Sequence, residues 1–137
     1  MRLGDYTVEY VDGYRPPIVV ERKSLNDIYG SLSKGYKRLK RRINEAIKQK
    51  IRFIILVEAS LTKIGKPQEF STRNPDEIKQ QLFTLLIKHG ILFVCCNNPE
   101  EAAEWVTQLF IAVGKEHIRD LKEQKKGVKN GKIKGSD

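Results

Sequence analysis

Two short, almost continuous apolar segments constrain the fold of this chain more than any other feature of its sequence. They span residues 51–59 and 91–96 and consist mainly of Ile, Leu, Val and Phe. Runs of this length are typical of strands that are covered on both faces. A helical pattern lies between them, opened by Asn74-Pro75 and ended by Gly90. The cap and the proline mark the start of a helix, so we expect helices packed against a sheet.

The first quarter of the chain predicts a pair of antiparallel strands. Residues 3–11 and 18–23 read as strands, and an Asp-Gly turn and a Pro-Pro pair separate them. A short connection favours a hairpin. We therefore expect Asp5, on the first strand, to lie close to Glu21 and Lys23 at the end of the second.

Three further helices complete the pattern. Ser24 can cap a short helix directly after the second strand, and Gly35 separates it from a helix over residues 36–49. The apolar face of that second helix is expected to consist of Leu39, Ile43, Ala46 and Ile47. A last, long helix starts at Asn98-Pro99. Strands and helices in this order predict an α/β fold with a mixed sheet flanked by helices.

Length and composition indicate one globular domain. With 137 residues, the chain can form a single core, which we assign to residues 1–123, followed by a flexible basic tail over residues 124–137. Cys95 and Cys96 are adjacent, so we expect them to be reduced core residues. Neither a secretory signal nor a bilayer-spanning run is present, so we expect no membrane association and a cytoplasmic location in a prokaryotic or viral host, or a nuclear one in a eukaryote.

Charge points to a nucleic-acid partner. The net charge is +9, and residues 34–50 contain eight basic residues and one acid. Such a helix can hold phosphates without reading bases. We expect DNA to contact Lys34, Lys37, Arg38, Lys40, Arg41 and Arg42. A merely solvated basic helix is the alternative.

One carboxylate and one ammonium group end the second strand. Glu21 and Lys23 are two residues apart, so on a strand they share a face at a separation of about 7 Å. If Asp5 joins them, the cluster has the oxygen ligands that Mg²⁺ prefers, and Lys23 can hold the attacking hydroxide or neutralise charge on the phosphate. The competing interpretation is a solvated strand end with local ion pairs.

The surrounding motif resembles the signature of XPF-type nuclease domains. That signature is Gly-Asp, a variable gap, Glu-Arg-Lys, three residues and Asp, and this chain fills it with Gly4-Asp5, Glu21-Arg22-Lys23 and Asp27. The resemblance implies a restriction-endonuclease-like fold. It also implies that Asp5 and Glu21 bind metal, that Lys23 assists hydrolysis, and that Arg22 and Asp27 support them.

Two features outside the motif extend or limit the resemblance. Glu58 ends the apolar strand as a carboxylate does in many similar domains, which makes it a candidate metal-linked group, with a surface acid as the alternative. Similar domains also have an earlier strand with an Asp-x-Arg-Glu segment, which this sequence, starting four residues before Asp5, lacks. A truncated reading frame or a partner subunit that supplies the segment are the two explanations.

The acidic cluster and the resemblance together predict an endonuclease that depends on Mg²⁺ or Mn²⁺. The resemblance implies that it cuts branched DNA, such as flaps or forks, in repair, recombination or replication. The resemblance further implies a homodimer or a partner subunit. Two alternatives remain: a catalytically weak, nuclease-like DNA-binding subunit, and a basic structural protein associated with nucleic acid. The absence of a recognised DNA-reading motif favours selection by DNA shape over sequence.

Overall fold

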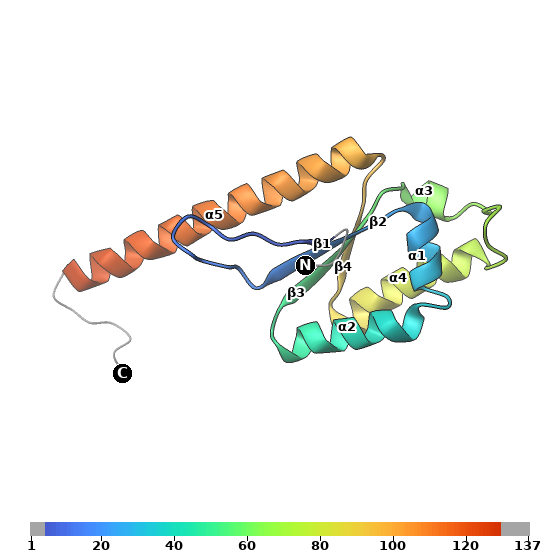
Figure 1. The fold of residues 1–137 in the computed structure, drawn as a ribbon, viewed down its shortest axis with the longest axis horizontal. Coiled ribbons are helices and arrows are strands. Elements are labelled where there is room, and N and C mark those ends of the chain that lie inside the picture. The colour runs from blue at the N-terminus through green and yellow to red at the C-terminus, as the bar shows by residue number, and fades with distance from the viewer. Residues whose placement is uncertain (1–4, 130–137) are drawn as a thin grey trace.

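A four-stranded mixed sheet forms the centre of the molecule, in a computed structural model that describes the backbone of residues 5–129 (Figure 1). The strand order is β1-β2-β3-β4; β1 is antiparallel to β2, and the other neighbours are parallel. This arrangement confirms the expected α/β class and mixed sheet. The strands are β1 (Asp5–Tyr6), β2 (Ile18–Lys23), β3 (Arg52–Val57) and β4 (Leu92–Cys95).

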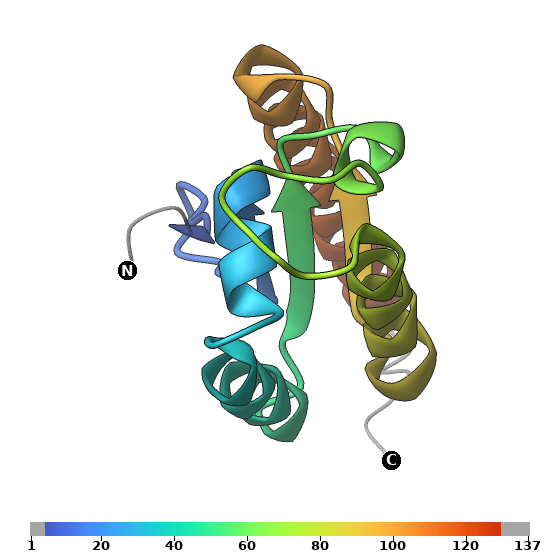
Figure 2. The ribbon, with the colours of Figure 1, turned by 90° about the vertical axis from the view of Figure 1, so that its right-hand side faces the viewer.

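Helices cover both faces of this sheet. The helices α1, α2 and α4 lie on one face and α5 lies on the other (Figure 2). The short α3 sits beside the start of α4. Their bounds are α1 (Leu25–Ser31), α2 (Tyr36–Lys48), α3 (Leu61–Ile64), α4 (Pro75–His89) and α5 (Pro99–Lys129).

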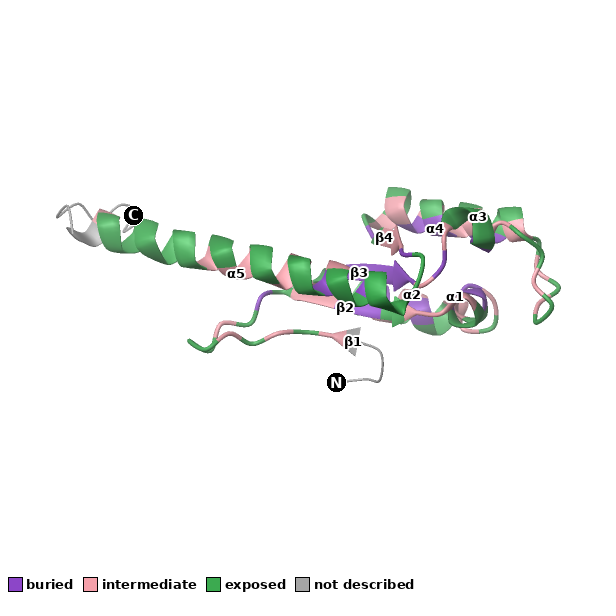
Figure 3. Cartoon of the chain, turned by 90° about the horizontal axis from the view of Figure 1, so that it is seen from above, coloured by how far each residue is buried: buried purple, intermediate pink, exposed green. Residues whose placement is uncertain are grey.

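Alternation along β3 produces two separate apolar cores. Phe53, Ile55 and Val57 pack with the helices α1, α2 and α4, whereas Ile54 and Leu56 pack with α5. All five side chains are buried, as the colouring of β3 in Figure 3 shows. The strand therefore has no solvated face, which explains why its sequence is apolar without interruption.

The capping residues act as their sequence positions predict. Ser24 Oγ accepts a hydrogen bond from the Asp27 amide at 3.1 Å, and Asn74 Oδ1 accepts one from the Asp76 amide at 2.8 Å. Gly90 ends α4 in the left-handed conformation, at φ 67°. These side chains satisfy amides that the first turn of a helix leaves unpaired, so they fix where each helix begins.

The expected first strand is much shorter than residues 3–11. Within the described residues only Asp5–Tyr6 pairs with β2, and positions 3 and 4 lie outside them. The following loop packs on α5 instead, where the rings of Tyr14 and His117 stack with centroids 3.9 Å apart. Aromatic packing on a helix therefore replaces the strand pairing that the alternating sequence predicted.

Other expectations also need correction. Ile47, expected on the buried face of α2, is 47% exposed, and β4 is an edge strand with Leu92 at 42%. Residues 124–129, assigned to a flexible tail, continue α5. The remainder of that tail lies outside the described residues.

Both cysteines are free thiols, as expected. Burial raises the pKa of Cys95 and of Cys96, which keeps both thiols protonated. No helix in the described part of the chain has the length and apolar character needed to cross a membrane.

Candidate active site

Strand pairing places Asp5 directly opposite Glu21. The Cα register of β1 and β2 pairs Asp5 with Glu21 and Tyr6 with Val20. Directly opposed positions of an antiparallel pair lie on the same face of the sheet. The backbone therefore gives the two acidic positions of the motif a common face, at the end of β2 from which α1 begins.

Glu21 is the one buried charged residue among the described side chains. It is 3% exposed, and its Oε1 accepts a hydrogen bond from Arg42 Nη1. Lys23 Nζ lies 3.7 Å from Oε2, within ion-pair range, but Oε2 has no hydrogen-bond partner among the described residues. Since a buried carboxylate oxygen without a partner is costly, this atom is available for a ligand.

Arg42 is part of this cluster, which the sequence reasoning did not anticipate. It was expected to contact DNA from the basic face of α2, but its side chain is only 19% exposed and binds Glu21. Its guanidinium carbon also lies 5.4 Å from the ring centre of Phe53. The signal was its spacing: Arg42 follows Leu39 by three residues and precedes Ala46 by four, so it lies along the apolar stripe.

Arg22 and Glu58 lie on the opposite face of the sheet. Arg22 alternates with Glu21 and Lys23, and its Nη1 donates a hydrogen bond to Tyr6 Oη at 2.9 Å. Its Nε forms an ion pair with Glu58 Oε2 at 3.2 Å, although the geometry falls short of a hydrogen bond. The structure thus brings Lys23 to Glu21 but separates Arg22 and Glu58 from them.

A cavity of about 420 Å³ opens between α1 and α2, and Lys23 and Arg42, the two cations that contact Glu21, line it. We call it the cationic pocket. Its charged lining consists of Lys23, Asp27, Lys34, Arg38 and Arg42. Four cations and one carboxylate in a concave site favour a ligand with negative charge, such as a phosphodiester.

The expected DNA-contacting residues divide into two groups around this pocket. Lys34, Arg38 and Arg42 follow one another at intervals of four and line it. Lys37 and Arg41 are exposed and lie outside its lining, as does Lys40, whose Nζ lies 5.6 Å from the ring centre of Tyr36. Helical spacing therefore assigns the first group to the site and leaves the second on the surface.

The family model of the ERCC4 domain matches residues 1–109 of this chain. The chain belongs to the ERCC4 domain family. The match contains the whole sheet and both helices that form the cationic pocket, and it confirms the resemblance to XPF-type nuclease domains and the restriction-endonuclease-like fold. No curated protein matched the chain. Membership indicates a nuclease-like function on DNA, and the ERCC4 family generally depends on a divalent metal.

The described side chains supply part of the ligand set that a divalent ion needs. Among the described residues, no three His, Cys, Asp or Glu side chains lie close enough to form a metal cluster. Glu21 nevertheless offers a buried oxygen without a hydrogen-bond partner, and the Asp5 position shares its face. Mg²⁺ typically takes one or two carboxylates and completes its shell with water and phosphate oxygens, so the Glu21 oxygen matches one ligand of such an ion.

Proposed function

We propose that this ERCC4 domain is a metal-dependent DNA endonuclease that hydrolyses phosphodiester bonds. The observation that carries the proposal is the buried Glu21 carboxylate, whose Oε2 has no hydrogen-bond partner among the described residues and lies 3.7 Å from Lys23 Nζ. Glu21 lies opposite the Asp5 position, and its two ion-pair partners, Lys23 and Arg42, line the cationic pocket. Buried charge in a cleft is a general mark of a functional site.

Each residue of this cluster has a proposed role. Asp5 and Glu21 would hold Mg²⁺ or Mn²⁺, which when bound lowers the pKa of a coordinated water and polarises the phosphate. Lys23, 18% exposed, presents its ammonium group to the same space and stabilises negative charge that develops on the phosphate oxygens. Asp27, on the first turn of α1, lines the pocket across which the DNA strand would pass.

Arg22 and Glu58 support the strands rather than the ion. Their ion pair joins the ends of β2 and β3 on the face that α5 covers. The backbone reinforces this junction, since the Glu58 amide donates a hydrogen bond to the Lys23 carbonyl at 2.8 Å. Both residues are therefore proposed to join β2 to β3 and to take no part in binding the ion.

The cationic pocket would hold the phosphates that flank the scissile bond. Lys34 and Arg38 present their charges on the side of the pocket formed by α2 and the turn before it. Contacts of this kind depend on charge and on backbone shape, not on base identity. Branched DNA, such as a flap or fork, is the proposed substrate class, with repair, recombination or replication as its setting.

A cleavage assay tests this proposal. End-labelled forked and linear DNA are incubated with the full chain in Mn²⁺, Mg²⁺ or EDTA, alongside Lys23→Met, Glu21→Gln and the matched control Lys88→Met. Lys88 lies in the exposed last turn of α4, so the control removes one positive charge away from the pocket. Metal-dependent cutting that is lost in the two site variants and kept in the control is expected.

A second candidate function has support from one contact. Arg42 already neutralises Glu21 through Oε1, so the carboxylate has a resident counterion before any metal arrives. This contact favours a DNA-binding subunit with weak catalysis. No cutting by the unaltered chain in the cleavage assay, together with metal-independent binding of the same DNA in a gel-shift measurement, would select this second function and reject the first.

A further inference from the structure

A second pocket lies on the other side of α1 from the cationic pocket. It has a volume of about 830 Å³, within the roughly 300–1,000 Å³ typical of ligand sites. Asn26, Gly30 and Lys34 line both pockets, so the two adjoin along α1 and the turn that follows it. We call the second one the outer pocket. Its far wall is the loop that connects α3 to α4.

An exposed aromatic ring forms part of that wall. Phe70 is 47% exposed, although its ring makes an edge contact with Tyr29 at a centroid distance of 5.5 Å. Tyr29 is itself held in place, because its hydroxyl donates a hydrogen bond to the Ile64 carbonyl at 2.6 Å. Phe70 is therefore a supported ring with substantial surface open to the pocket, which is the arrangement that stacks on a planar ligand.

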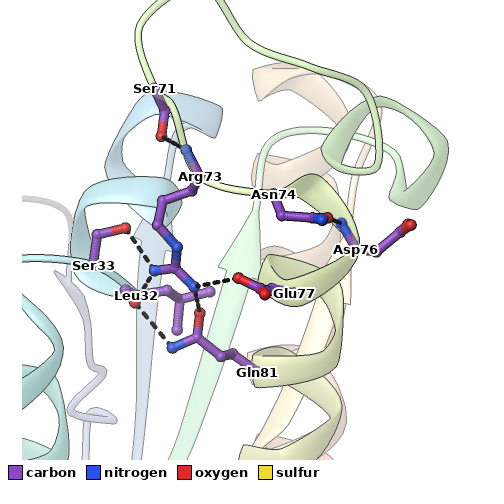
Figure 4. A network of polar contacts seen from close by, with 8 residues as sticks. All are labelled: Leu32, Ser33, Ser71, Arg73, Asn74, Asp76, Glu77 and Gln81. Carbon is purple, nitrogen blue, oxygen red and sulfur yellow. Dashed lines mark hydrogen bonds and ion pairs between the residues drawn. The ribbon is translucent and has the colours of Figure 1, made fainter.

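The loop around Phe70 is tied to the rest of the fold by Arg73. Arg73 Nη1 donates hydrogen bonds to the Leu32 carbonyl at 2.9 Å and to Ser33 Oγ at 3.0 Å, and Nη2 donates one to Gln81 Oε1 at 2.6 Å (Figure 4). Gln81 in turn donates to the Leu32 carbonyl at 2.9 Å. This network joins the end of α1 to α4, so the wall of the pocket is formed before any ligand arrives.

The charges of the outer pocket differ from those of its neighbour. Lys34, at the shared edge, and Arg73 are its cations, and the guanidinium of Arg73 is already occupied by the network. Glu69 adds a carboxylate. A phosphate is therefore better accommodated in the cationic pocket, whereas the outer pocket suits a neutral planar group that carries polar edges.

We propose that the outer pocket receives an unpaired nucleobase next to the phosphate held in the cationic pocket, with Phe70 as its stacking partner. This inference rests on the proposed nuclease function and specifies the substrate. A strand that crosses α1 passes Lys34 and brings its next base to Phe70. Bases within a duplex are stacked on one another, so only a nucleotide at a flap, fork or gap can enter. Such stacking is sequence-tolerant, because every base has a π-face.

Binding measured by fluorescence anisotropy tests the proposal, in Ca²⁺ so that the DNA stays intact. The probes are a blunt duplex and a fork with the same duplex arm, and the variants are Phe70→Ala, Phe70→Trp and the matched control Phe83→Ala. Phe83 is similarly exposed, at 40%, and makes an edge contact with Phe93, but it lies on α4 outside the pocket. Truncating either ring therefore carries a comparable packing loss.

Phe70→Ala is expected to weaken fork binding by roughly 5- to 100-fold, the effect of losing one base-aromatic stack. Binding to the blunt duplex should stay unchanged, Phe70→Trp should retain fork binding, and Phe83→Ala should affect neither probe. Equal affinity of Phe70→Ala and the unaltered chain for the fork overturns the pocket assignment. So does an equal loss on both probes. In either case the cleavage assay still decides the nuclease function separately.

Photocross-linking gives a second readout that needs no variant. A fork carrying 5-iodouracil at the first unpaired position is irradiated with the full chain, and the cross-linked peptide is sequenced by mass spectrometry. The proposal expects a cross-link to Phe70 or Tyr29. A cross-link confined to peptides outside the outer pocket overturns it.

Discussion

Removing the guanidinium of Arg42 should destabilise the fold far more than removing an ordinary surface charge. Glu21 is 3% exposed and Arg42 supplies its hydrogen bond, so Arg42→Met leaves a buried carboxylate with Lys23 Nζ at 3.7 Å as its remaining described cation. Loss of one partner from a buried ion pair typically costs about 3–5 kcal/mol. Because Lys23 remains and Arg42 is partly exposed, we expect about 3 kcal/mol, the lower end of that range.

Urea unfolding in EDTA, followed by circular dichroism, measures this effect without competition from metal ions. Methionine keeps an apolar side chain of similar length, while the guanidinium and its contact with the Phe53 ring are removed. In a Glu21→Gln background the same substitution should cost about 1 kcal/mol, because no buried charge is left unpaired. If Arg42→Met costs less than about 1 kcal/mol, or costs the same in both backgrounds, Arg42 is not the counterion of Glu21.

Three further outcomes are expected. A backbone hydrogen bond from Tyr14, and next the side-chain hydrogen bond with His117, lower the pKa of Asp12 below its ordinary 3.8. The pKa of Asp12 is therefore lower in the folded than in the unfolded state. The resulting stabilisation is present above pH 3.8 and is lost as the pH falls through the folded-state pKa. Asp12→Asn should therefore lower the urea midpoint at about pH 6 and have a progressively smaller effect as the pH falls below 3.8; an effect that stays constant as the pH falls would contradict this linkage. Gly90→Ala should cost about 1 kcal/mol in urea unfolding, since φ is 67° and no atom crowds the added methyl group, so the backbone alone opposes it. Arg38→Gln should reduce the slope of log affinity against log salt by about 0.9 on duplex DNA, and an unchanged slope would show that Arg38 contacts no phosphate.

Local signals in the sequence were sufficient for most element boundaries. Strand β2 runs from Ile18 to Lys23 as expected, and α4 lies between its Asn74 cap and Gly90. Both depend on neighbours within a few residues, through capping hydrogen bonds or the period of apolar side chains. The length of α5 was underestimated because its last turns have no apolar pattern that would signal a helix.

The features of the site that the sequence did not predict depend on contacts between residues far apart in the chain. The pairing of Arg42 with Glu21 joins residues twenty-one positions apart, and a basic run conceals the one arginine that faces inward. The sequence predicted that Glu21 and Lys23 share one face of β2. It follows that Arg22, which lies between them, points to the other face, but this consequence was not predicted. Glu58 was a candidate metal-linked group because similar domains have a carboxylate at the end of this strand, and the structure shows Arg22 as its ion-pair partner.

The central claim is that Asp5 and Glu21 hold one divalent ion on the face of the sheet that carries Lys23. Isothermal titration of Mn²⁺ into the full chain tests it directly, with Asp5→Asn and Glu21→Gln as site variants and Glu58→Gln as the control from the opposite face. We expect one binding event that both site variants lose and the control retains. Binding that survives Glu21→Gln, or that disappears in a folded Glu58→Gln, would contradict it.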